Sequence, residues 1–140
     1  MIIGMGNPLR GDDAAGPALV GKLTGNVRAL CIDAGTAPEN YLGKIAKEKP
    51  DTVLFADAVH LERGPGEYEI LKGRDILRAG FTTHDISPAL LIDYLERETG
   101  AGIFLLGIQP QDLAFGSEMT LPVSRSVTEL ETMIKECLHA

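Results

Sequence analysis

The sequence is poor in aromatic and basic residues and has no long apolar run. It contains no tryptophan, and its 13 Lys and Arg residues are outnumbered by 20 Asp and Glu residues, giving a net charge of −7. Because the basic residues are scattered singly, no positive stripe is present that could neutralise nucleic-acid phosphates. Apolar runs such as residues 103–106 fall far short of the roughly 20 residues that a membrane span needs, and no charged-then-apolar signal peptide precedes the first motif. We therefore expect a cytoplasmic protein with neither nucleic acid nor a membrane as its partner.

Cysteine is scarce as well. Cys31 and Cys137 lack the close spacing of a zinc-binding or redox pair, so we expect two buried, reduced thiols. No repeat, low-complexity tract or linker divides the 140 residues, of which 44% are hydrophobic and 24% charged. The chain is therefore expected to form a single domain over residues 1–140, without disulfides.

Short apolar runs of β-forming residues alternate with longer segments of helical period. This alternation predicts an α/β fold: a mostly parallel sheet of about five strands with helices on both faces. An antiparallel edge strand is compatible with the turn glycines and alternating pattern of residues 63–72. The expected strands are residues 1–5, 27–34, 52–57, 63–72 and 102–110, and the expected helices are residues 13–23, 38–47, 86–99 and 123–138.

The segment from Gly4 to Gly16 follows the first strand and has four glycines, one proline and two adjacent aspartates. Glycines between a strand and a helix are typical of phosphate-binding loops. Here Pro8 removes one backbone N–H, Asp12 and Asp13 put negative charge where a phosphate would lie, and no Gly-Lys-Ser/Thr follows. A non-catalytic nucleotide- or metal-binding α/β module is therefore kept only as the alternative function.

Ligands of open parallel sheets bind outside the carboxyl ends of the strands. Asp57 ends the largely apolar six-residue segment TVLFAD, where a carboxylate is costly unless it is paired, hydrogen-bonded or bound to a cation. Asp13 follows the first strand, and His84 joins the same edge if its loop folds back over it. These three side chains would form an O,O,N set that suits Ni²⁺, Mn²⁺ or Zn²⁺ and leaves coordination positions open.

Each of these residues also has a purely structural interpretation. Asp12 or Asp13 could cap the following helix, and His84 could equally be a surface loop residue before its own helix. Asp33 ends the second strand, where its carboxylate could accept N–H bonds from the turn after it. A self-sufficient zinc peptidase would show a denser set of His and Glu ligands than this chain offers.

Five segments, in order and over nearly the whole chain, resemble the nickel-iron hydrogenase maturation endopeptidases: GMGNPLRGDDAAGP, DAGTAPEN, ADAVHLERGPGE, TTHDISP and FLLGIQP. GTAPEN and LGIQP look most like the branch that processes formate-hydrogenlyase-type and deazaflavin-reducing hydrogenases. The resemblance implies an endopeptidase that removes the C-terminal extension of a hydrogenase large-subunit precursor after nickel insertion. It leaves the oligomeric state open.

The resemblance also implies roles for particular residues. The nickel-contacting residues of the family fall on Asp13, Asp57 and His84, with the Ni²⁺ carried by the substrate as a recognition mark; other divalent ions could occupy the site. Asp13 is the candidate for a direct part in hydrolysis. The supporting residues are expected to be Gly6, Asn7 and Gly11, which shape the loop, Asp12, which would start the helix, and Asp33, which would orient the neighbouring loop.

Overall fold

The computed structural model describes residues 1–79 and 86–139. Its five strands form one sheet in the order β2-β1-β3-β5-β4. All neighbouring strands run parallel except β4, which lies antiparallel to β5 at the edge of the sheet. The strands are β1 (Ile2–Gly4), β2 (Cys31–Asp33), β3 (Thr52–Ala58), β4 (Tyr68–Lys72) and β5 (Gly102–Ile108).

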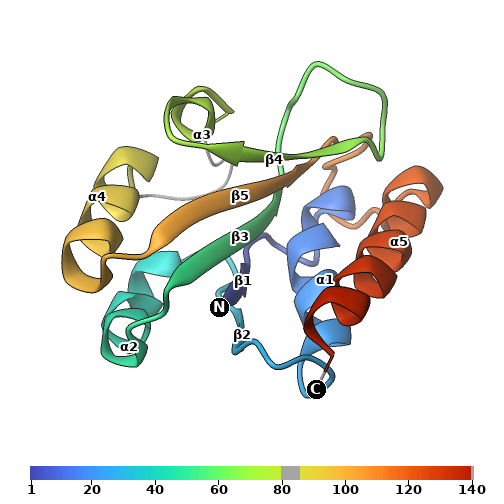
Figure 1. Cartoon of the computed structure of the whole chain (residues 1–140). Coiled ribbons are helices and arrows are strands. Elements are labelled where there is room, and N and C mark those ends of the chain that lie inside the picture. Colours follow the sequence, from blue (N-terminus) through green and yellow to red (C-terminus); the bar gives the residue numbers. More distant parts are fainter. Residues whose placement is uncertain (80–85, 140) are drawn as a thin grey trace.

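Helices cover both faces of the sheet (Figure 1). Packed against one face are α1 (Ala15–Leu23) and α5 (Leu121–Leu138), and on the other face lie α2 (Leu42–Glu48), α3 (Arg74–Ala79) and α4 (Pro88–Thr99). Successive strand residues point to opposite faces, so Phe55 and Leu105 belong to the core under α4, whereas Ala56 and Leu106 belong to the core under α1 and α5. The predicted α/β fold, with its antiparallel edge strand, is confirmed.

The ends of several elements differ from the expected ones. Residues 11–14 form a short 3₁₀ helix, η1 (Gly11–Ala14), so the α-helix begins at Ala15 rather than at Asp13. The second strand is confined to β2, and Val27 makes an isolated bridge with His139 instead. Helix α3 was not expected, because six residues carry too little periodic pattern to be recognised.

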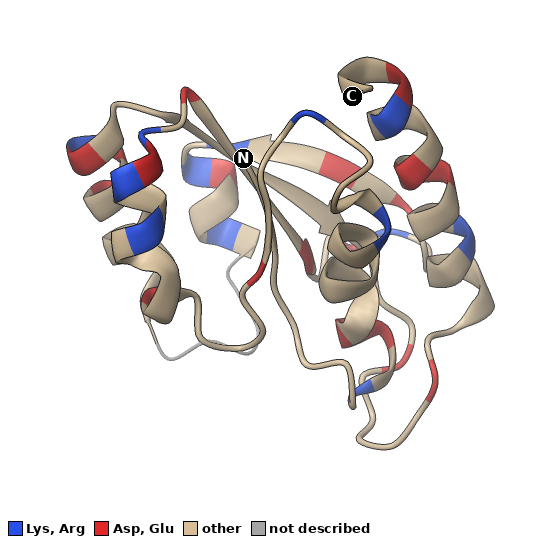
Figure 2. Cartoon of the chain, turned by 90° about the horizontal axis from the view of Figure 1, so that it is seen from below, with Lys and Arg blue, Asp and Glu red and all other residues tan. Residues whose placement is uncertain are grey.

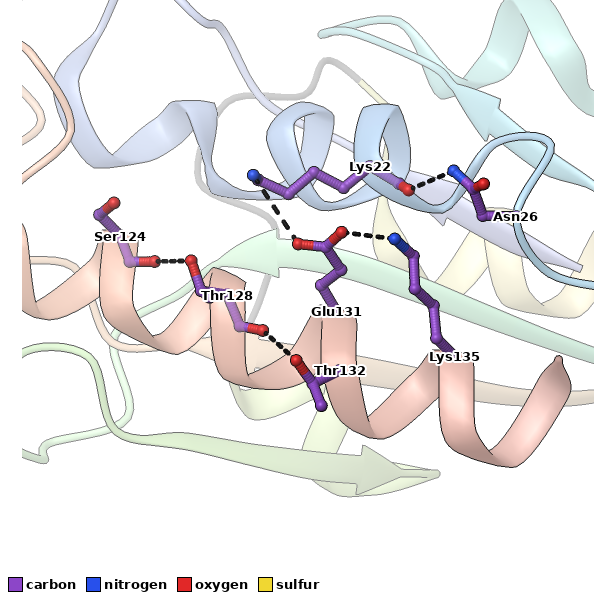
Figure 3. Close-up of polar contacts among 7 residues, drawn as sticks. All are labelled: Lys22, Asn26, Ser124, Thr128, Glu131, Thr132 and Lys135. Carbon is purple, nitrogen blue, oxygen red and sulfur yellow. Dashed lines mark hydrogen bonds and ion pairs between the residues drawn. The ribbon is translucent and has the colours of Figure 1, made fainter.

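Two contacts hold α1 in place. A Cβ atom on Gly16 would come within 2.4 Å of the backbone oxygens of Met5 and Ala56, so only glycine allows the helix to lie this close to the ends of β1 and β3. On the outer side, Glu131 of α5 forms ion pairs with Lys22 of α1 and with Lys135 (Figure 3). The Gly16 contact places the start of α1, and η1 before it, against the carboxyl ends of the two strands.

Candidate active site at the carboxyl edge of the sheet

The strand order reverses between β1 and β3. The chain leaves β1 for its neighbour β2 on one side, and β3 then pairs with the other side of β1. Gly4 is in register with Ala56, and the Met5 N–H donates to the Ala56 oxygen at 2.9 Å. The loop after β1 thus begins beside Asp57, at the position where ligands of open α/β sheets bind.

Asp13 and Asp57 lie at this point, and both are fully buried, with 0% exposure. Asp57 is inside β3 itself, between two buried alanines. The carboxyl group of Asp13 lies against Gly6, since a Cβ atom on that glycine would come 3.3 Å from Asp13 Cγ. The Asn7 backbone N–H donates to Asp13 Oδ2 at 2.7 Å. Two fully buried carboxylates at adjacent strand ends are costly to bury, and functional sites concentrate such groups.

His84, the third member of the predicted set, lies outside the described residues. In residues 1–79 and 86–139, no group of three or more His, Cys, Asp or Glu side chains could hold a metal ion. The described residues therefore do not test a site made by Asp13, Asp57 and His84. The assignment of all three residues to nickel stays a prediction.

Asp12 does not cap a helix, contrary to expectation. Neither η1 nor α1 has a side-chain cap, and the buried Asp12 carboxylate instead binds the loop that follows β5. It accepts the backbone N–H groups of Gln111 at 2.8 Å, Asp112 at 3.0 Å and Thr120 at 2.7 Å, together with the Thr120 hydroxyl. The two adjacent aspartates therefore differ in their surroundings: Asp12 joins two loops, while Asp13 lies at the ends of β1 and β3.

The opening loop offers no cradle for a phosphate. Its backbone N–H groups already have acceptors inside the protein. The donors and their acceptors are Gly6 to Gly35 O, Asn7 to Asp13 Oδ2, Leu9 to Asn7 Oδ1, Arg10 to Asn7 O, Gly11 to Ser117 O, Asp12 to Asp112 O, and Asp13 to Arg10 O. A phosphate-binding loop needs several of these donors directed at the ligand. This arrangement disfavours the nucleotide-binding alternative.

Gly6 and Gly11 give the loop its path. Gly6 has φ +137°, and a Cβ there would lie 1.9 Å from the Asp13 oxygen; Gly11 has φ +53°, and a Cβ there would lie 2.3 Å from the Asp112 oxygen. L side chains rarely adopt these conformations, and the surrounding backbone leaves no room for one. Asn7 stabilises the same turn, because its Oδ1 accepts the Leu9 N–H at 2.9 Å.

Two other polar residues at strand ends support neighbouring loops. Asp33 is exposed, and its Oδ1 accepts the Gly35 N–H at 3.0 Å, which is the structural interpretation considered for it above. Gln109 is buried, and its Oε1 accepts the Leu61 N–H at 2.6 Å while its Nε2 donates to the Pro110 oxygen. The sequence shows that Gln109 directly follows the last strand, but only the structure shows that it anchors the β3–β4 loop.

Outside the site, the surface carries interspersed charges. In Figure 2, both acidic and basic residues lie along the helices. Every helix among the described residues is too short or too polar to cross a membrane. Both cysteines are free, but the expectation that both are buried is wrong: Cys31 is half-buried and Cys137 is exposed on α5. Burial raises the pKa of the Cys31 thiol.

Comparison with known proteins gives the family. A sequence model described as hydrogenase maturation protease matches residues 19–137. The hydrogenase 3 maturation protease of Escherichia coli K12 is 37% identical, over 91% of this chain and 83% of that protein.

Two solved structures agree with this match. The crystal structure of the NiFe hydrogenase maturation protease HycI from Thermococcus kodakarensis KOD1 superposes with a TM-score of 0.87 at 34% identity, covering 96% of this chain and 88% of that one. The solution structure of the endopeptidase HycI from Escherichia coli superposes with a TM-score of 0.86 at 34% identity, covering 97% of this chain and 88% of that one. The chain therefore belongs to the hydrogenase maturation protease family and is a peptidase.

Proposed function

We propose that this peptidase removes the C-terminal extension of a hydrogenase large-subunit precursor, and that it recognises the precursor by the nickel ion that the precursor already carries. The observation that carries the proposal is the pair of fully buried carboxylates, Asp13 and Asp57, at the adjoining carboxyl ends of β1 and β3. Membership of the hydrogenase maturation protease family supplies the class of substrate.

The donor chemistry of these residues fits a divalent ion of borderline softness. Two carboxylates supply oxygen ligands, and His84, outside the described residues, would supply an imidazole nitrogen. No cysteine is included in this set, so we expect the site to hold an isolated ion only loosely. In our proposal, Asp13, Asp57 and His84 contact the nickel of the substrate rather than a resident metal.

Recognition through the ion makes tail removal conditional on cofactor assembly. A precursor without nickel lacks these contacts and therefore gains no differential binding energy at this site. Of the two described carboxylates, Asp13 is the candidate for activating a water or the scissile carbonyl. It lies in a glycine-bearing loop that a peptide backbone can approach closely, and the Asn7 N–H holds its Oδ2 in place.

The test compares nickel-loaded and metal-free precursor, with the mass of the large subunit measured after incubation. We expect tail loss only from the nickel-loaded form, and at least a ~100-fold slower loss with Asp13→Asn, Asp57→Asn or His84→Ala, the size typical of removing one acid-base group. Asp51→Asn is the matched control, because Asp51 is an exposed carboxylate just before the opposite end of β3.

Thermal midpoints of the Asp13→Asn and Asp57→Asn variants should stay near that of the wild type, which separates lost chemistry from lost folding. Equal cleavage of the two precursor forms would refute recognition through nickel while leaving the peptidase assignment intact. Full activity of Asp57→Asn would remove Asp57 from the site.

A further inference from the structure

We propose that the two loops joined by Asp12 form a docking surface for the folded body of the precursor, separate from the site that receives its tail. The docking surface consists of Leu9 in the loop after β1, Phe115 in the loop after β5, and Leu121 at the start of α5. This inference rests on the proposed function, because it assigns a second contact to the same large-subunit substrate.

The side chains of the docking surface are unusually exposed for their type. Phe115 is 71% exposed, Leu121 61% and Leu9 60%. They are three of the five most exposed large hydrophobic side chains among residues 1–79 and 86–139, although they come only from two loops and from the helix residue that follows the second loop. Single exposed apolar residues are normal on protein surfaces, whereas a concentration of them marks an interaction site.

Backbone hydrogen bonds hold the two loops together before any partner binds. The Gly116 N–H donates to the Leu9 oxygen at 2.7 Å, and the Gly11 N–H donates to the Ser117 oxygen at 3.1 Å. The Asp12 carboxylate accepts the N–H of Thr120, the residue before Leu121. Each apolar side chain is therefore attached to, or adjacent to, an anchored backbone, so binding here costs little ordering of the loops.

The docking surface and the candidate active site share the loop after β1. Leu9 is four residues before Asp13, so their Cα atoms are at most about 14 Å apart. The intervening loop is the same one whose Asn7 N–H binds Asp13 Oδ2. A folded protein whose chain end reaches Asp13 thus has its body within reach of these apolar side chains, which suit the apolar anchors at the centre of a protein interface.

The experiment measures both binding and turnover for Phe115→Ser and Leu121→Ser. The control is Ile70→Ser, since Ile70 is 62% exposed but lies on edge strand β4, in the groove between the sheet and α5. The Kd is measured by interferometry with metal-free precursor, which is not cleaved under the proposed function. The KM and kcat are measured with nickel-loaded precursor.

We expect Phe115→Ser to raise the Kd and the KM by about tenfold, as for an interface anchor, with kcat within twofold of the wild type. Ile70→Ser should leave all three values within twofold. Unchanged Kd and KM in both loop variants would overturn the docking surface. A fall in kcat alone would also overturn it, because the loops would then act only by positioning Asp13.

The failures of the two proposals can be told apart. If the wild type cleaves the precursor and the loop variants match it, only the docking surface is wrong. If the wild type cleaves nothing, the proposed function fails, and the Kd series still decides whether these loops bind the precursor. Sedimentation of wild type and Phe115→Ser adds one more outcome: a dimer lost in the variant with an unchanged precursor Kd would assign the surface to a second copy of this chain.

Discussion

Replacing Asp12 by Asn should destabilise the fold substantially, although the two side chains have nearly the same shape. Asp12 is fully buried. Its Oδ1 accepts the Thr120 N–H at 2.7 Å, and its Oδ2 accepts the N–H groups of Gln111 at 2.8 Å and Asp112 at 3.0 Å. Whichever oxygen becomes the amide nitrogen, at least one backbone N–H then faces a donor instead of an acceptor.

The magnitude follows from these contacts. A hydrogen bond to a charged group contributes ≈ 1.5–3 kcal/mol, and the bonds that remain to a neutral amide are worth less, so Asp12→Asn should cost about 3 kcal/mol. Total stability of such a domain is about 5–15 kcal/mol. At roughly 3 °C per kcal/mol for a chain of this size, the thermal midpoint should fall by about 10 °C.

Thermal unfolding followed by circular dichroism, with urea unfolding as a second measurement, tests this prediction. The control is Asp112→Asn in the partner loop, because Asp112 Oδ1 accepts a single N–H, that of Ala114 at 2.8 Å, which an amide oxygen can still accept. It should cost less than about 1 kcal/mol. A midpoint for Asp12→Asn within about 2 °C of the wild type would refute the assignment of Asp12 as the link between the two loops.

Three further predictions concern the packing of α1, the cysteines and the ion pairs of α5. Gly16→Ala should destabilise the protein by more than about 3 kcal/mol in urea unfolding, because the added Cβ would meet backbone atoms. Gly21→Ala should stabilise it by about 0.5–1 kcal/mol, because the added Cβ meets nothing within 4 Å. Equal effects of the two substitutions would contradict the close contact at Gly16. At pH 8 a thiol reagent should modify Cys137 before Cys31, whose raised pKa and burial leave less accessible thiolate, as mass spectrometry of tryptic peptides would show. The Lys135 ion pair lowers the pKa of Glu131, so the stability that Glu131 contributes is present above its unfolded pKa and is lost as the pH falls. The difference in thermal midpoint between the wild type and Glu131→Gln should therefore be small at neutral pH, shrink with added salt and disappear in acid. A difference that widened in acid would contradict this assignment.

The sequence by itself determined the fold class and much of the candidate site. Apolar runs of strand length alternating with helical periods predict a parallel sheet, because each strand in such a sheet is buried on both faces. Asp57 was also recognisable from its immediate neighbours, because it is a carboxylate at the end of an apolar run. Gly100 directly follows the expected helix of residues 86–99 and has φ +70°, a conformation that glycine adopts without strain.

Other features depend on residues far apart in the chain. The two adjacent aspartates of the opening loop look equivalent in the sequence, and each could have capped a helix. Asp12 differs from Asp13 because its partners are 99 to 108 residues away, in a loop that no local pattern connects to it. The pairing of β1 with β3 brings the Asp13 loop beside Asp57, and it likewise depends on the order of the strands in the sheet rather than on the local sequence. Local periodicity determines which residues form strands and helices, whereas strand order and loop partners are decided only when the whole core packs, and it is this packing that distinguishes the anchoring aspartate from the candidate catalytic one.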